Sequence, residues 1–231
     1  TRQRMGLVSF SDGEVERQPG YLLEDRLVNL ADVDSGWSKA RLFNDMIALE
    51  NEIWTSVVES GVAVRSVEST QLYRPVIPSK IIRLEGCYRQ DLTDTGYNSR
   101  IEPDGLNEMD WPSSWAAPLS STVGPRDSLL LPRYASDVRP GAELGLVIGE
   151  WGKNLTPDEA TAAVGGVTLG GCLTIHDELP GLEGYKMFDN SMAIGPEIVP
   201  LERVEVDNLD LRVSIDGDRI AVRNTGEWRF S

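Results

Sequence analysis

Short apolar runs bounded by glycine, proline or other turn residues occupy most of the chain. The run at residues 143–149 closes on a glycine, which is typical of a strand with at least one buried face. A glycine-rich run at 167–175 has the same character and leads into His176, Asp177 and Glu178. The sequence therefore predicts two strands with charged and titratable side chains at their ends.

Two helices are predicted from other patterns. Between the two strands, Thr156 can cap a helix, Pro157 suits its first turn, and Glu159 completes a capping box. This helix should run to about residue 164 and end at the glycine pair 165–166. Residues 38–60 carry apolar side chains at helical spacing and predict an amphipathic helix whose aromatic and methionine residues pack in a core.

The remaining apolar runs predict short strands and one hairpin. Clean alternation over 209–215, the turn at Asp216 and Gly217, and the run at 219–222 are a strong hairpin signal. Further short strands are expected within 6–34, at 81–84 and at 128–131, the last preceded by a tight turn at 123–127.

Residues 93–121 are polar, rich in proline, glycine and aspartate, and without regular periodicity. A long irregular stretch of this kind is usually a lid, a pocket wall or a mobile loop. Trp111 and Trp115 could line a pocket, and packing at a surface hinge is an equal alternative. Prolines hold 73–78 extended as a linker, so we expect a small amino-terminal domain at 1–75 and a larger one at 76–231.

The composition and net charge limit the classes of partner that we expect. The 231 residues carry a formal net charge of −15 and 40% apolar residues, which suits a globular protein and argues against nucleic-acid or anionic-membrane partners. No apolar run is long enough to span a bilayer, and the amino terminus is not a signal peptide. Cys87 and Cys172 have neither metal-site nor disulfide-framework spacing, which suits a reducing cytoplasm.

Three residues carry candidate chemistry. Glu143 lies at the mouth of an apolar strand, where a charge must be solvated, paired or bound to a metal. His176 is the only histidine, and its ordinary pKa lies near neutrality, so it could act as general acid or base with Asp177 or Glu178 orienting it; an inert surface histidine is the alternative. Lys186 could anchor a carboxylate or polarise a carbonyl, although such a lysine is usually only a solvated charge.

The order of several segments resembles the fumarylacetoacetate hydrolase superfamily. The segments are GAELGLVIG, GVTLGGCLTIHD, KMFDNSMAIGPEIV, SKIIRLEGCYRQDLTD, STVGPRDSLLLP and FSDGEVERQPGYLLEDRLVNLADV, which together cover most of the chain. The resemblance implies an α+β, mainly β fold, a mixed β-sandwich roll with a small amino-terminal α+β domain. It also implies a homodimer or higher homo-oligomer packed through the roll.

The departures from the family pattern concern its metal site. The family's magnesium or manganese ligands, two glutamates and an aspartate, fall here on Gly141, Glu143 and Cys172, so one carboxylate of three is kept. We therefore expect no metal cofactor, with Glu143 as a weak metal candidate. A magnesium or manganese site rebuilt from acidic residues is the less favoured alternative. Its ligands would be Asp91, Asp94, Glu143, Asp177 and Glu178.

The catalytic pattern is altered as well. The family's catalytic His-x-x-Glu pair falls on Asp91 and Asp94, a lysine often found near the pocket on Ala117, and a substrate-contacting arginine on His176. Lys186 and Asp189 match the family. Cys172 is the weakest candidate, since a thiol in an apolar strand normally packs as a small hydrophobe.

Two functional hypotheses follow from this pattern. The favoured one is a cytoplasmic enzyme that acts on a small oxo or keto acid by metal-independent acid–base chemistry, as an isomerase, cyclase, dehydratase or decarboxylase. Its catalytic residues would be His176, Lys186, Glu143 and Asp91, and its substrate-binding residues would be Tyr88, Trp115, Asp177 and Asp189. The second hypothesis is an inactive subunit that binds a small acid or supports an active partner. A usual metal-dependent carbon–carbon bond hydrolase is a third alternative.

The family fold continues beyond the last segment matched here, with a further helix and a Gly-Asp-x-Ile-x-Thr-Gly-Thr-Pro loop. The sequence ends at Ser231 without them. Either another chain completes the roll, or the gene product continues past this residue.

Overall fold

A computed structural model describes residues 5–11, 13–14, 17–23, 25–33, 55–56, 59, 64–88, 112–177 and 186–228. Most of the amphipathic helix expected at 38–60 lies outside these ranges. Four residues named above, Asp91, Asp94, Trp111 and Glu178, also lie outside them.

The amino-terminal strands form one antiparallel sheet in the order β4-β3-β2-β1-β5. Phe10, Leu22, Leu27 and Leu72 are buried together on it, because alternation places the apolar side chains of neighbouring strands on one face. The short strands expected within 6–34 are therefore confirmed. The elements are β1 (Met5–Ser11), β2 (Gln18–Leu23), β3 (Arg26–Asn29), α1 (Leu30–Val33), β4 (Val64–Ser66) and β5 (Gln71–Tyr73).

The second sheet is built on two long antiparallel strands, β9 (Val138–Ile148) and β10 (Val164–Ile175). Three shorter strands extend it from β10 in the order β12-β10-β11-β8. These are β8 (Thr122–Val123), β11 (Met192–Ile194) and β12 (Val199–Pro200). The strands expected at 143–149 and 167–175 are thus confirmed, and both are longer than the apolar runs that predicted them.

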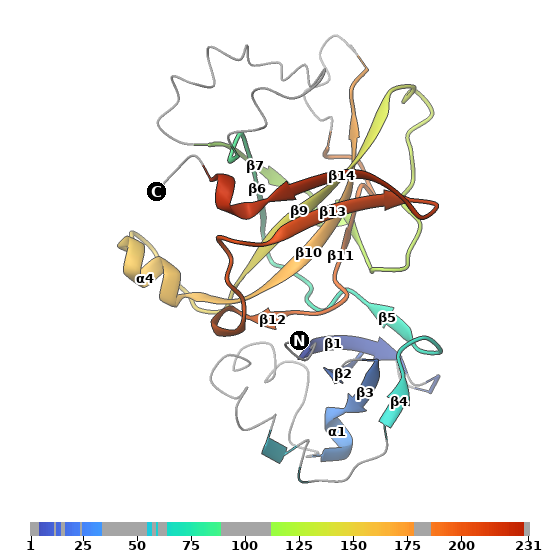
Figure 1. The fold of residues 1–231 in the computed structure, drawn as a ribbon, viewed down its shortest axis with the longest axis vertical. Coiled ribbons are helices and arrows are strands. Elements are labelled where there is room, and N and C mark those ends of the chain that lie inside the picture. The colour runs from blue at the N-terminus through green and yellow to red at the C-terminus, as the bar shows by residue number, and fades with distance from the viewer. Residues whose placement is uncertain are drawn as a thin grey trace.

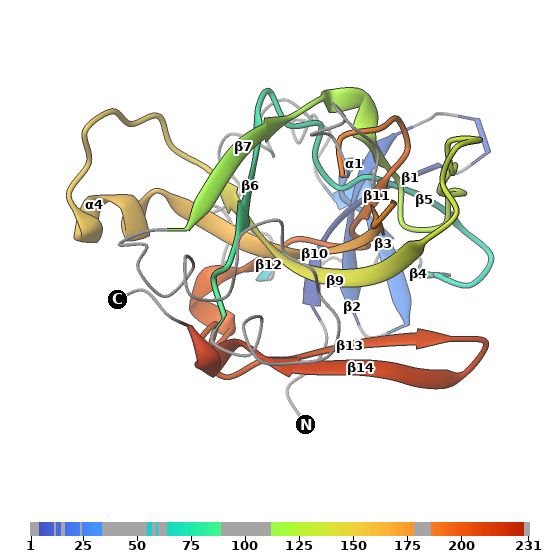
Figure 2. The ribbon, with the colours of Figure 1, turned by 90° about the horizontal axis from the view of Figure 1, so that it is seen from above.

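Two hairpin-like pairs lie on opposite sides of the β9–β10 ribbon (Figure 2). On one side β6 (Ile81–Glu85) pairs with β7 (Ser113–Ala117). On the other side β13 (Asp210–Ile215) pairs with β14 (Asp218–Asn224), and β13 also contacts β9. The predicted turn between β13 and β14 is confirmed, with positive φ at Asp216 and Gly217, as such two-residue turns require.

The α4 helix (Pro157–Ala162) connects β9 and β10 and begins as its sequence predicts. Thr156 accepts a hydrogen bond from the backbone of Glu159, whose side chain accepts in return from the backbone of Thr156. Its end was predicted wrongly. The helix ends at Ala162, and the expected terminating glycines at 165–166 lie inside β10. A Cβ at Gly166 would lie 2.6 Å from the backbone oxygen of Val199 on β12. That glycine is needed for strand pairing rather than for stopping the helix.

Two other predictions need correction. Residues 128–131 form no strand. The backbone amide of Leu130 donates to the carbonyl of Asn190, and the side chains of Leu130 and Leu131 are exposed. Within the stretch predicted to be irregular, residues 113–117 form β7, because β6 offers a free edge with which they pair. The tight turn at 123–127 is confirmed by a hydrogen bond from the amide of Asp127 to the carbonyl of Gly124.

The first sheet lies below the second in Figure 1, and β1 of the first sheet contacts β12 of the second. Leu7 and Ile198 exchange backbone hydrogen bonds of 3.0 and 2.9 Å there. The division into domains at residue 75 remains a prediction. Its position lies just after β5, the last strand of the first sheet.

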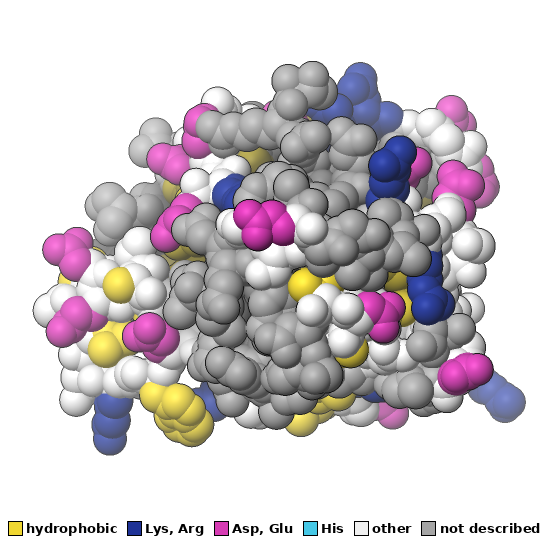
Figure 3. Space-filling model, turned by 90° about the horizontal axis from the view of Figure 1, so that it is seen from below, with side chains coloured by type: hydrophobic (Ala, Val, Ile, Leu, Met, Phe, Trp, Pro, Cys, Tyr) yellow, Lys and Arg dark blue, Asp and Glu magenta, His cyan; other side chains and the backbone are white. Residues whose placement is uncertain are grey.

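Acidic side chains are scattered over the face in Figure 3 rather than gathered into one patch. None of the helices in the described ranges has the length and apolar character needed to cross a membrane. The expected α+β, mainly β fold class is confirmed.

Candidate active site

Glu143 lies on the face of the β9–β10 ribbon that is turned toward β6. It stands opposite Gly170 on β10, and a side chain at Gly170 would be 3.5 Å from the Glu143 Cβ. Opposite residues of an antiparallel pair project to the same side, so the glycine leaves room beside Glu143. Cys172 follows two residues later on β10 and projects to this same side.

Arg83 on β6 reaches across to this carboxylate. Its Nη2 donates to Glu143 Oε1 at 2.5 Å, and its Nη1 donates to the backbone oxygen of Lys186 at 3.0 Å. The Arg83 side chain is only 3% exposed. A buried charge requires a partner, and Glu143 provides one, so this contact ties β6 to β9.

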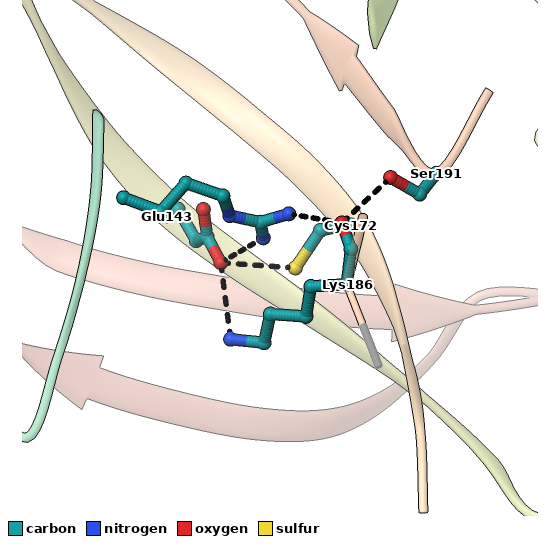
Figure 4. Close-up of polar contacts among 5 residues, drawn as sticks. Glu143, Cys172, Lys186 and Ser191 are labelled. Atoms are coloured by element: carbon teal, nitrogen blue, oxygen red, sulfur yellow. Dashed lines mark hydrogen bonds and ion pairs between the residues drawn. The ribbon is translucent and has the colours of Figure 1, made fainter. Parts of the chain in front are cut away.

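Lys186 completes a three-residue ion network on Glu143 (Figure 4). Its Nζ lies 3.3 Å from Glu143 Oε1. Its backbone oxygen also accepts from the Ser191 hydroxyl at 3.0 Å, so the backbone of Lys186 is held by both Arg83 and Ser191. Two cations face one carboxylate here, and the network carries a formal charge of +1.

The network changes the acidity of its members. Burial alone would raise the pKa of Glu143, but the charges of Lys186 and Arg83, with hydrogen bonds from Arg83 and Cys172, outweigh it and hold the pKa below its ordinary value. Burial and the neighbouring Glu143 charge raise the pKa of the Cys172 thiol to about 11. Cys172 is therefore a neutral thiol at pH 7, and its Sγ donates to Glu143 Oε1 at 3.3 Å.

These residues do not fit a divalent metal ion. Magnesium and manganese prefer several oxygen ligands, whereas this site offers one carboxylate, one protonated thiol and two cations. Glu143 Oε1 already accepts from Arg83, Lys186 and Cys172. Within the described ranges no group of three or more His, Cys, Asp and Glu side chains could hold a metal. Of the alternative acidic ligand set, Asp91, Asp94 and Glu178 lie outside those ranges.

Trp115 is brought to this site by the pairing of β6 with β7. It is the direct partner of Arg83 in the register, so both side chains project to the same face. Glu85 is two residues from Arg83 on β6 and shares that face. The face of the β6–β7 pair that carries Arg83 thus also carries Trp115 and a second carboxylate.

His176 follows the last residue of β10 and is half-buried. It lies four residues beyond Cys172, about 13 Å along an extended chain. Burial, then the charge of Arg139, lowers the pKa of His176, and Lys186 lowers it further while Asp137 and Glu85 raise it. The charges of Lys186 and Glu85 thus act on the pKa of His176 in opposite directions.

Three of the other predicted residues, Asp177, Asp189 and Tyr88, have separate surroundings. Asp177 accepts hydrogen bonds from the backbone and hydroxyl of Ser136 and from the backbone of Asp137, an arrangement that holds the loop before β9. Asp189 accepts from the Ser120 hydroxyl at 2.6 Å. The ring of Tyr88 lies 5.1 Å from that of Trp228. Asp91 lies outside the described residues, and the roles assigned to all four remain predictions.

Sequence reasoning did not identify Arg83. No local sequence pattern singled it out, and its burial is a finding of the structure: in β6 the apolar residues Ile82 and Leu84 are 54% and 52% exposed, whereas Arg83 between them is buried. A strand that turns its charged residue inward departs from the ordinary pattern, and such departures concentrate at functional sites.

Residues 80–231 match the family model for the carboxy-terminal domain of fumarylacetoacetate hydrolase. The chain belongs to the fumarylacetoacetate hydrolase family. The resemblance inferred from its sequence segments is therefore confirmed, and the matched range contains every member of the ion network.

Curated relatives have been given several names. The chain is 24% identical over 242 residues to a fumarylacetoacetate hydrolase domain-containing protein 2 homolog of Dictyostelium discoideum, covering 95% of this chain and 74% of the relative. It is 28% identical over 182 residues to a mitochondrial oxaloacetate tautomerase of Xenopus laevis, covering 76% of this chain and 54% of the relative. This chain thus spans about half the length of that tautomerase.

Solved structures share the fold. Maleylpyruvate hydrolase from a Sphingobium species aligns with a TM-score of 0.75 at 20% identity, over 97% of this chain and 79% of the hydrolase. The same hydrolase has been solved with manganese(II) and pyruvate, and that structure aligns with a TM-score of 0.74 at 20% identity, over 97% of this chain and 78% of the hydrolase.

Proposed function

We propose that this chain is an enzyme that isomerises a small 2-oxo acid between its keto and enol forms without a metal ion. The observation that carries the proposal is the convergence of Arg83 and Lys186 on Glu143, on the inward face of the β9–β10 ribbon. The positive charge of this site comes from the side chains of Arg83 and Lys186.

Keto–enol isomerisation requires positive charge close to the carbonyl oxygen of the substrate. Removal of a proton beside a carbonyl leaves negative charge on the carbonyl oxygen, and fixed positive groups lower the barrier by stabilising it. A bound metal ion can supply this stabilisation as a Lewis acid. Here the ammonium of Lys186 and the guanidinium of Arg83 would supply it, with Glu143 holding both cations in place.

His176 is the proposed general base. Its lowered pKa leaves the imidazole neutral at pH 7, which is the form that accepts a proton. Asp91 is a second candidate for proton transfer. Tyr88, Trp115, Asp177 and Asp189 are proposed to bind substrate, and the position of Trp115 opposite Arg83 supports this assignment for one of them.

The names of the relatives favour isomerisation among the reactions considered. Relatives from frog, cattle and human are named oxaloacetate tautomerases, and a fold neighbour from Mycobacterium marinum is named an isomerase. Keto–enol isomerisation is also the simplest of the four, because it needs only proton transfer and charge stabilisation. Cyclisation, dehydration and decarboxylation each add a further bond change.

The test uses protein freed of metal by chelation and desalting. We expect it to accelerate the approach of oxaloacetate to its keto–enol equilibrium, followed by ultraviolet absorbance, and His176→Ala to lower kcat by about 100-fold or more. A matched control is Arg212→Gln, which removes a charge from an exposed pair with Asp210. Unchanged rates in His176→Ala would refute the assigned base. Activity that appears only on addition of magnesium or manganese would refute metal independence.

One observation favours the second candidate function, an inactive binding or partner subunit. Arg83 and Lys186 are both already paired with Glu143, as in a purely structural ion network. This alternative predicts that the protein does not accelerate the isomerisation of any small oxo acid, together with unchanged partner binding in a His176/Lys186 double alanine variant.

A homodimer and a cytoplasmic location are retained as proposals, to be tested by light scattering and by imaging of the tagged protein.

A further inference from the structure

Arg83 has hydrogen-bonding capacity that the described protein groups do not use. A guanidinium carries five N–H donors in a fixed planar arrangement. Nη1 and Nη2 bond to Lys186 and Glu143, whereas Nε is buried and has no hydrogen-bond partner in the described part of the chain. A buried donor without a partner costs about 1–3 kcal/mol, so an incoming acceptor oxygen would gain from meeting it.

The charge of the network points the same way. Arg83, Lys186 and Glu143 together carry a formal +1, with the carboxylate of Glu85 on the same face of β6, whereas the whole chain carries −15. A small anion is repelled by the protein as a whole, and a local positive site is needed to hold it. The Glu143 and Lys186 side chains of the network are 30% and 14% exposed, while Arg83 is 3% exposed.

We infer that Arg83 is a substrate-binding residue, whose guanidinium acts with the Lys186 ammonium to hold two adjacent oxygens of a 2-oxo acid or its enolate. The planar donors of an arginine suit two neighbouring acceptor oxygens, and a 2-oxo acid presents a carboxylate beside a carbonyl. Trp115, which faces the same side as Arg83, provides the apolar wall beside them. This inference rests on the proposed function for its substrate class.

Oxalate is the probe, because it is a small dianion with adjacent oxygens and resembles the enolate of a 2-oxo acid. Binding is measured by calorimetry with protein freed of metal. Wild-type protein should bind oxalate, and Arg83→Met should bind it about ten- to hundredfold more weakly. Arg83→Lys keeps the charge but loses the planar donors and should also bind more weakly. Arg212→Met removes the same charge from an exposed position and should bind as the wild type does.

A second measurement avoids reliance on a variant that fails to fold. The 15N–1H resonance of Arg83 Nε, assigned by its absence in Arg83→Lys, should shift when oxalate is added to wild-type protein. No oxalate binding by metal-free protein, unchanged affinity in Arg83→Met, or an unmoved Nε resonance would each overturn the inference.

The two proposals can fail separately. If metal-free protein accelerates oxaloacetate tautomerisation while Arg83→Met keeps full oxalate affinity, the enzyme assignment stands and the role of Arg83 falls. If oxalate binding depends on Arg83 but no oxo acid is turned over, the anion site stands and the enzyme assignment falls.

Discussion

Arg83 donates to Glu143 across 2.5 Å, although sixty residues separate them in the sequence. The contact joins β6, on one side of the β9–β10 ribbon, to β9 itself. It also explains why β6 turns its arginine inward and its two neighbouring apolar side chains outward, because Glu143, the counter-ion of Arg83, lies on that inner face.

Replacing Glu143 with glutamine should destabilise the fold. The side chain keeps its shape but leaves the buried Arg83 without a counter-charge, and breaking a buried ion pair costs about 3–5 kcal/mol. Because Glu143 is 30% exposed, we expect about 2–3 kcal/mol, measured as the free energy of unfolding in urea. Asp210→Asn is the matched control, since it breaks the exposed pair with Arg212; equal losses in both variants would contradict this account.

The contribution of Glu143 to the free energy of unfolding should decrease as the pH falls. Its folded pKa lies below the ordinary value, so its stabilisation is complete above the unfolded pKa of about 4.3 and is lost as pH falls through the folded pKa. The stability difference between wild type and Glu143→Gln should therefore narrow below about pH 4. Urea unfolding at pH 7, 5 and 3 checks this, and a difference that widens on acidification would refute it.

Much of the fold could be predicted from local sequence. The β9–α4–β10 unit and the β13–β14 hairpin are encoded by apolar runs, a capping box and an Asp-Gly turn, all of which act over a few residues. Residues 128–131 look like a strand locally, but no strand within the described part of the chain pairs with them. Strand formation depends on a partner, which a single segment does not reveal.

The site was only partly predictable for the same reason. Glu143 and Lys186 were identified because a charge in an apolar strand needs an explanation and because their segments resemble a family. Arg83 was missed because its partner is sixty residues away, and Trp115 could be placed beside it only once β6 and β7 were paired. The sequence therefore identified the carboxylate and one of its cations, and the long-range contact revealed only the second cation, Arg83.

Cys172 should be unreactive in the folded protein. Burial, and then the charge of Glu143, raises the pKa of its thiol to about 11, so the reactive thiolate is scarce at pH 8. Relative to an ordinary thiol of pKa about 8.5, alkylation by iodoacetamide should be slower by about two orders of magnitude. Peptide mass spectrometry measures this, with urea-unfolded protein as the control in which Cys172 reacts freely. Labelling of native Cys172 as fast as free cysteine would contradict the prediction.

The pH profile of turnover should report His176. Since burial and Arg139 lower its pKa, a base acting in its neutral form should lose activity only as pH falls below about 6.5. Arg139→Gln removes one lowering charge and should move the acidic limb of kcat/KM to higher pH, whereas Asp137→Asn removes a raising charge and should move it lower. The profiles are measured with oxaloacetate. An acidic limb that stays at the same pH in both variants would exclude His176 as the titrating group.

The cation network should also be convertible into a metal site. A side chain at Gly141 would point at Cys172, since its Cβ would lie 3.2 Å from the Cys172 Sγ, and Cys172 in turn contacts Glu143. Gly141→Glu with Cys172→Asp therefore brings three carboxylates together, the kind of ligand set that magnesium and manganese bind. With Arg83 in place its guanidinium competes for those oxygens, so the double variant should bind manganese weakly. Adding Arg83→Met should strengthen manganese binding at least tenfold in calorimetry. Equal affinity with and without Arg83 would show that its guanidinium does not compete with the metal ion for the carboxylate oxygens.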